Sequence, residues 1–112
     1  MKITVPKILD LKSKRQITMM TAYDFPTSKA VSEAQIDIIL VGDSLAQVVL
    51  GHDDTLSVNM DEMLHHVKAV SRAKPDCLVV ADMPYMSYHN TKEEAVKNCL
   101  LYTSDAADDV RS

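Results

Sequence analysis

The chain has 112 residues, 46 % of them hydrophobic and 25 % charged, and its formal net charge is −4 at pH 7. This composition is typical of a globular domain and excludes a disordered chain. The negative charge argues against nucleic-acid binding, and the basic trio Lys12, Lys14 and Arg15 is expected to be a solvated surface. No apolar run approaches the length of about 18 residues that a membrane helix needs. The N-terminus lacks the apolar region of a secretory signal, so we expect a cytoplasmic protein.

The first half of the chain predicts a strand, a helix and a second strand. Residues 17–24 (ITMMTAYD) are apolar and β-branched and predict the first strand. Asp24 can cap the helix that follows, and the first turn of that helix tolerates Pro26. This helix is expected to place three residues on one face: Ala30, Val31 and Ala34. Residues 36–43 (IDIILVGD) are continuously apolar, which suits a strand covered on both faces.

The second half repeats the alternation. Asn59 followed by Glu62 has the spacing of a capping box. Apolar residues then recur at helical spacing: Met60, Met63, Leu64, Val67 and Val70. Residues 77–84 (CLVVADMP) predict a third strand, and a third helix is expected over residues 92–98. This order is typical of βαβ units around a parallel sheet, which opens either a doubly wound sheet or a (β/α)8 barrel.

The chain holds two glycines, Gly42 and Gly51, far below the usual share of about 7 %. Both lie between residues 38 and 55, where apolar runs stop. Glycine concentrated in this way indicates backbone that turns sharply or approaches a ligand closely. No Gly-x-Gly-x-x-Gly follows the first strand, which argues against a dinucleotide-binding domain.

The second and third predicted strands both end in aspartate, Asp43 and Asp82. Neighbouring parallel strands lie about 4.8 Å apart, and right-handed crossovers would leave both carboxylates at one carboxyl edge of the sheet. The pair could share Mg²⁺, which commonly takes one or two carboxylates. Alternatively, each aspartate caps the turn that follows its strand. Ser44 fits either interpretation, as a turn residue or as a donor to a substrate carboxylate.

Four stretches resemble the ketopantoate (3-methyl-2-oxobutanoate) hydroxymethyltransferase family: TAYD (21–24), LVGDSL (40–45), GHDDTL (51–56) and CLVVADMPYMSY (77–88). The likeness runs from about Ile8 to Asn98. It implies an α/β fold of the (β/α)8 TIM-barrel family, with the first three βα units in this chain. It also implies a homo-oligomer that transfers a hydroxymethyl group from the co-substrate 5,10-methylenetetrahydrofolate to 3-methyl-2-oxobutanoate. The product would be 2-dehydropantoate, in pantothenate biosynthesis.

The same resemblance assigns roles to individual residues. It implies that Asp43 and Asp82 bind one Mg²⁺ per subunit, and that both, with Ser44, bind the 2-oxo acid. The general base of the family is a glutamate farther downstream, so no catalytic residue is expected in this chain. Where the first helix ends, at Ala34-Gln35, the family usually has a glycine that can serve as a left-handed cap. A magnesium-dependent barrel enzyme of the phosphoenolpyruvate mutase/isocitrate lyase kind remains an alternative.

The end of the chain departs from the family pattern. A (β/α)8 barrel typically takes about 250 residues. Residues 99–112 (CLLYTSDAADDVRS) lack the lysine and glutamate that the family's fourth strand would carry. We therefore predict that residues 1–98 are the N-terminal part of a barrel domain and that residues 99–112 are a non-native tail. The chain by itself is expected to be inactive, and a non-enzymatic fragment is the further alternative.

Overall fold

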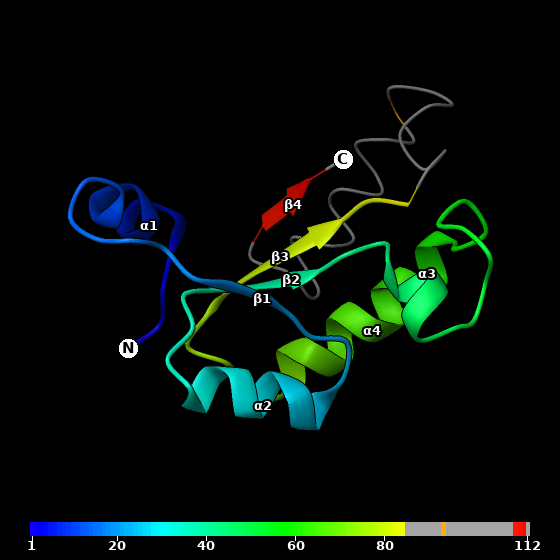
Figure 1. Ribbon diagram of the computed structural model, residues 1–112, viewed down its shortest axis with the longest axis horizontal. Coiled ribbons are helices and arrows are strands. Elements are labelled where there is room, and N and C mark those ends of the chain that lie inside the picture. The colour runs from blue at the N-terminus through cyan, green and yellow to red at the C-terminus, as the bar shows by residue number, and fades with distance from the viewer. Residues whose placement is uncertain (85–92, 94–108, 112) are drawn as a thin grey trace.

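The computed structural model describes residues 1–84, 93 and 109–111. Its strands form one parallel sheet in the order β1-β2-β3-β4 (Figure 1). The bounds are Met19–Thr21 for β1, Ile38–Val41 for β2, Leu78–Asp82 for β3 and Asp109–Arg111 for β4. The three predicted strands are therefore confirmed, each shorter than its apolar run. Val41 lies opposite Ala81, so β2 and β3 reach the carboxyl edge of the sheet together.

Helices α2 (Phe25–Glu33) and α4 (Met60–Arg72) lie side by side on one face of the sheet (Figure 1). The predicted cap of α2 is confirmed, since the Asp24 carboxylate accepts the Thr27 N–H at 2.8 Å. The predicted packing face of α2 is wrong in part, because Val31 is buried whereas Ala30 and Ala34 are exposed. Ser28 is buried in their place, because its hydroxyl donates to the Val70 carbonyl of α4 at 2.8 Å and so remains hydrogen-bonded between the helices.

The capping box at the start of α4 is confirmed. The Glu62 N–H donates to Asn59 Oδ1 at 2.9 Å, and the Asn59 N–H donates to Glu62 Oε1 at 3.1 Å. The apolar stripe faces the sheet as its spacing predicted, with Met63, Val67 and Val70 buried and Met60 and Leu64 partly buried. These side chains pack in one core with strand residues Ile39, Val41, Val79 and Ala81.

Two helices were missed in the sequence, α1 (Val5–Leu11) and α3 (Leu45–Val48). Both are too short for apolar periodicity to reveal them, although Thr4, whose hydroxyl accepts the Lys7 N–H, is an N-cap signal for α1. The helix predicted over residues 92–98 lies outside the described residues, except for Glu93, which is helical. Within the described ranges, no helix combines the length and apolar character needed to cross a bilayer.

Gln35, two positions beyond the end of α2, adopts a left-handed conformation without being glycine. Gln35 has φ = 61°, whereas Ala34 before it has φ = −79°. The resemblance implies a glycine at this place, and left-handed backbone costs an L-residue about 1–2 kcal/mol. The turn is therefore locally strained.

We expect Gln35→Gly to raise the free energy of unfolding by about 0.5–1 kcal/mol, because relief of the left-handed strain exceeds the added freedom of the unfolded chain. Urea unfolding of the whole protein measures this difference. Ala34→Gly is the matched control and should lower the stability, because φ at Ala34 suits any L-residue. Equal effects of the two substitutions would contradict the prediction.

Candidate functional site

The ends of β2 and β3 meet at the carboxyl edge of the sheet. Asp82, the last residue of β3, is only 8 % exposed, and its Oδ2 accepts the backbone N–H of Asp43 at 3.1 Å. This contact follows from the register, since Val41 and Ala81 are opposite and Gly42 and Asp82 come next. The two strand ends that the sequence predicted to be neighbours are in contact. The shared metal ion stays a prediction.

Gly42 lies beside the oxygen atoms of Asp82 and Ser44. A Cβ atom added to Gly42 would lie 3.4 Å from Asp82 Oδ2 and 3.5 Å from Ser44 Oγ. A longer side chain would therefore compete with any ligand that approaches these two oxygens. Gly51 has a different role, because its φ of 77° belongs to a left-handed turn after α3. The left-handed turn accounts for Gly51, whereas a Cβ atom at Gly42 would make ordinary van der Waals contacts.

Tyr23 reaches the same edge from the end of β1. Its phenol oxygen lies 2.6 Å from Ser44 Oγ, and both side chains are partly exposed. The carbonyl oxygen of Tyr23 accepts a hydrogen bond from Nδ1 of His66 on α4 at 2.8 Å. Tyr23 belongs to residues 17–24, the first predicted strand, but the sequence had no signal for its contact with His66, which lies 43 positions later.

The oxygen atoms at this edge suit a hard cation. Asp43, Ser44 and Asp82 offer carboxylate and hydroxyl oxygens without nitrogen or sulfur ligands. Among the described residues, no three His, Cys, Asp or Glu side chains gather closely enough to form a metal site by themselves. Two carboxylates completed by water and substrate oxygens are typical of Mg²⁺, whereas a structural zinc site needs four protein ligands. The donor set therefore fits an open magnesium site.

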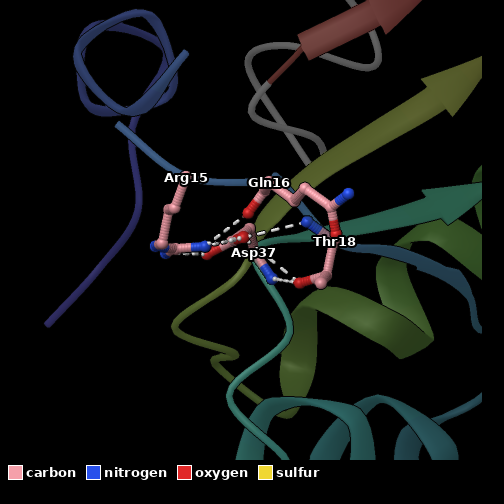
Figure 2. Close-up of polar contacts among 4 residues, drawn as sticks. All are labelled: Arg15, Gln16, Thr18 and Asp37. Atoms are coloured by element: carbon pink, nitrogen blue, oxygen red, sulfur yellow. Dashed lines mark hydrogen bonds and ion pairs between the residues drawn. The ribbon is translucent and has the colours of Figure 1, made fainter. Parts of the chain in front are cut away.

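A second polar cluster lies at the opposite, amino-terminal edge of the sheet (Figure 2). Arg15 donates to both carboxylate oxygens of Asp37, at 2.8 and 2.7 Å, and Thr18 donates its N–H at 3.0 Å and its hydroxyl at 3.2 Å. Asp37 is only 3 % exposed. The Arg15 hydrogen bonds hold the pKa of this carboxyl well below its ordinary value, with a smaller contribution from Thr18.

Arg15 is exposed, as expected of the basic trio, but its guanidinium also binds the buried Asp37 carboxylate, a contact that the sequence did not reveal. Lys14 does lie on the surface, where it pairs with the exposed Asp10 at 3.2 Å. A hollow of about 540 Å³, lined in part by Arg15, Thr18 and Asp37, opens at this edge. Active sites of barrels lie at the carboxyl edge instead, so we assign the Arg15–Asp37 cluster to stability.

The fold has counterparts among solved structures. Phosphonopyruvate hydrolase in complex with oxalate and Mg²⁺ superposes with a TM-score of 0.76 at 16 % identity, over 96 % of this chain and 38 % of that one. A 2,3-dimethylmalate lyase of the phosphoenolpyruvate mutase/isocitrate lyase superfamily gives a TM-score of 0.69 at 17 % identity, over 96 % and 38 % of the two chains. The parallel sheet is thus the first part of an α/β barrel of the (β/α)8 TIM-barrel family.

Sequence comparison defines the family within this class. The family model described as ketopantoate hydroxymethyltransferase matches residues 2–111. A 3-methyl-2-oxobutanoate hydroxymethyltransferase of Pelobacter propionicus is 57 % identical over 99 residues, which are 88 % of this chain and 37 % of the relative. One from Sulfolobus acidocaldarius is 52 % identical over 110 residues, 98 % of this chain and 41 % of the relative. The chain belongs to the ketopantoate hydroxymethyltransferase family.

The chain spans about two fifths of the length of these curated relatives, 37 % and 41 % for the two named above. The family match passes the predicted boundary at residue 98, and β4, which pairs with β3, lies beyond that boundary. The division into residues 1–98 and a non-native tail at residues 99–112 stays a prediction.

Proposed function

We propose that the whole protein transfers a hydroxymethyl group from 5,10-methylenetetrahydrofolate to 3-methyl-2-oxobutanoate and so makes 2-dehydropantoate for pantothenate biosynthesis. The observation that carries this proposal is the contact between the Asp82 carboxylate and the Asp43 N–H, at adjoining strand ends of a chain from this family. The printed names of the relatives support the same transfer. The general base is expected from a part of the whole protein outside this chain.

In this proposal Asp43 and Asp82 hold one Mg²⁺ per subunit, and Ser44 donates its hydroxyl proton to the carboxylate of the oxo acid. When bound, the cation supplies Lewis-acid stabilisation of negative charge on the keto oxygen while the C3 proton leaves. Asp82 is buried and fixed by the Asp43 N–H, so its carboxylate is already oriented before a ligand arrives. The complex of phosphonopyruvate hydrolase with oxalate and Mg²⁺ supports a similar pairing of cation and acid on this fold.

The same proposal covers partners and location. The partners are small molecules, an oxo acid and a reduced folate, together with further copies of the whole protein in a homo-oligomer. A cytoplasmic location, without nucleic-acid or membrane partners, agrees with the acidic net charge of −4 and with a metabolic role for the relatives. Size-exclusion chromatography of the whole protein tests the oligomer.

An assay of the whole protein tests the reaction. We expect 2-dehydropantoate to form from 3-methyl-2-oxobutanoate and 5,10-methylenetetrahydrofolate, to stop when a chelator removes the metal, and to return when Mg²⁺ is added. Incubation with 2-methylisocitrate is the control, because cleavage of that compound would favour a lyase of the phosphoenolpyruvate mutase/isocitrate lyase kind. Absence of 2-dehydropantoate with Mg²⁺ present would refute the proposal. The 112-residue chain should show no turnover.

A further inference from the structure

The hydroxyl of Ser44 is held by a neighbouring strand and not by its own turn. Ser44 precedes α3, but its side chain makes no capping hydrogen bond to that helix. Its Oγ lies 2.6 Å from the phenol oxygen of Tyr23, a well-formed distance for an O–H···O bond. The residue proposed to bind the substrate carboxylate is thus coupled to the end of β1.

The chemistry of the groups fixes the direction of this bond when an anion binds. A serine hydroxyl has one proton to donate and lone pairs that accept, whereas a carboxylate can only accept. If Ser44 donates to the carboxylate of an oxo acid, its bond with Tyr23 must have the phenol as donor. The Tyr23 hydroxyl then donates to Ser44 Oγ, and the Ser44 hydroxyl donates to the ligand.

His66 fixes the main chain that carries the phenol. A carbonyl oxygen can only accept a hydrogen bond, so the 2.8 Å contact requires a proton on His66 Nδ1. This bond joins α4 to the end of β1 at the residue whose side chain contacts Ser44. Tyr23 is therefore held both at its backbone and at its hydroxyl.

We propose that Tyr23 is a positioning residue for the oxo-acid site, which acts through Ser44 and is itself held by His66. The inference rests on the proposed function and deepens it. With the phenol as donor, the Ser44 proton points away from Tyr23, and the site presents a donor to an anionic acceptor. Tyr23 thereby favours ligands that carry a carboxylate at this position.

The test measures binding of 3-methyl-2-oxobutanoate to the whole protein in Mg²⁺ by calorimetry. Tyr23→Phe keeps the ring and should weaken binding by about three- to tenfold, the usual effect of one hydrogen bond. Tyr23→Phe combined with Ser44→Ala should bind as weakly as Ser44→Ala alone, because Tyr23 acts through Ser44. Wild-type affinity in Tyr23→Phe, or losses that add in the double variant, would overturn the proposal.

Substitutions at His66 test the second bond. His66→Leu should weaken binding of the oxo acid by about three- to tenfold, and His66→Asn should restore most of it, since its amide can donate from a position near Nδ1. His65→Leu is the matched control. His65 is exposed, and its ring lies edge-on to that of His66 with 5.4 Å between the ring centroids. The His65→Leu protein should bind the oxo acid as tightly as the wild type does. Equal losses in His65→Leu and His66→Leu would contradict a role for the Tyr23 contact.

Binding of the oxo acid by the wild-type protein separates failure of the proposed function from failure of the positioning role. If the wild-type protein does not bind the oxo acid in Mg²⁺, the proposed function fails, and the hydrogen bond between Tyr23 and Ser44 has no ligand to act on. If the wild type binds but the losses of Tyr23→Phe and Ser44→Ala add in the double variant, the positioning role alone is overturned.

Discussion

Replacement of Asp82 by asparagine in the whole protein is expected to lower kcat/KM by about a thousandfold. Asparagine has nearly the same size, and its Oδ1 can still accept the Asp43 N–H that the carboxylate accepts at 3.1 Å. The substitution therefore keeps the local structure and removes one negative charge from the proposed magnesium ligands. A loss of about 4 kcal/mol in transition-state stabilisation corresponds to this factor. Kinetics over a range of Mg²⁺ concentrations, with calorimetric titration of Mg²⁺, measure the effect.

Asp76→Asn is the matched control for this prediction. Asp76 lies just before β3, at the other end of the strand from Asp82, and its side chain is 67 % exposed. We expect the activity of the Asp76→Asn protein to equal that of the wild type. If Asp82→Asn retained activity within tenfold of the wild type at saturating Mg²⁺, Asp82 would not be a metal ligand.

The second large effect concerns the stability of the amino-terminal edge. Asp37→Ala should lower the free energy of unfolding by about 2 kcal/mol, because Arg15 and Thr18 lose their shared acceptor. This value is smaller than the roughly 3–5 kcal/mol for breaking a fully buried pair, because the Arg15 side chain is 49 % exposed and is screened by water. Urea unfolding of the whole protein at neutral pH measures the loss.

The same carboxylate predicts a pH dependence. The pKa of Asp37 is lower in the folded chain than the ordinary aspartate value of about 3.9. Its contribution to stability is therefore complete above that value and is lost as the pH falls below about 4, toward the folded-state pKa. The difference in unfolding free energy between the wild type and Asp37→Ala should shrink over this range.

Asp10→Ala provides the control for both measurements. Its carboxylate pairs with Lys14 at 3.2 Å but is 59 % exposed, so its removal should change the stability little. An Asp37→Ala protein as stable as Asp10→Ala at neutral pH would show that the Arg15–Asp37 pair adds nothing to the fold.

Much of this fold could be predicted because its signals are local. The spacing of Asn59 and Glu62 determined the start of α4, and the cap at Asp24 determined that of α2. Strands β2 and β3 were evident because parallel strands covered on both faces are apolar without interruption. Once β2 and β3 are known to be neighbouring parallel strands, their ends must lie at the same edge of the sheet. This brings Asp82 close to Asp43.

The remaining features depend on contacts between distant residues. The bond between His66 and Tyr23, and that between Ser28 and Val70, join elements about forty positions apart, and no local pattern encodes them. Arg15 looked like any surface cation because its partner, Asp37, lies inside an apolar run 22 positions later. The sequence could place residues along an edge, but the pairing of side chains required the packed structure.

The strand order β1-β2-β3-β4 has a consequence for synthesis on the ribosome. Among the described strands, β2, β3 and β4 each pair with the strand that precedes them in the chain, so each of these three meets a partner that has already been synthesised. Helices α2 and α4 are made between the strands whose face they cover, and the core can close as the chain emerges. The topology therefore permits folding from the N-terminus onward, in which Asp43 is synthesised before Asp82 pairs beside it.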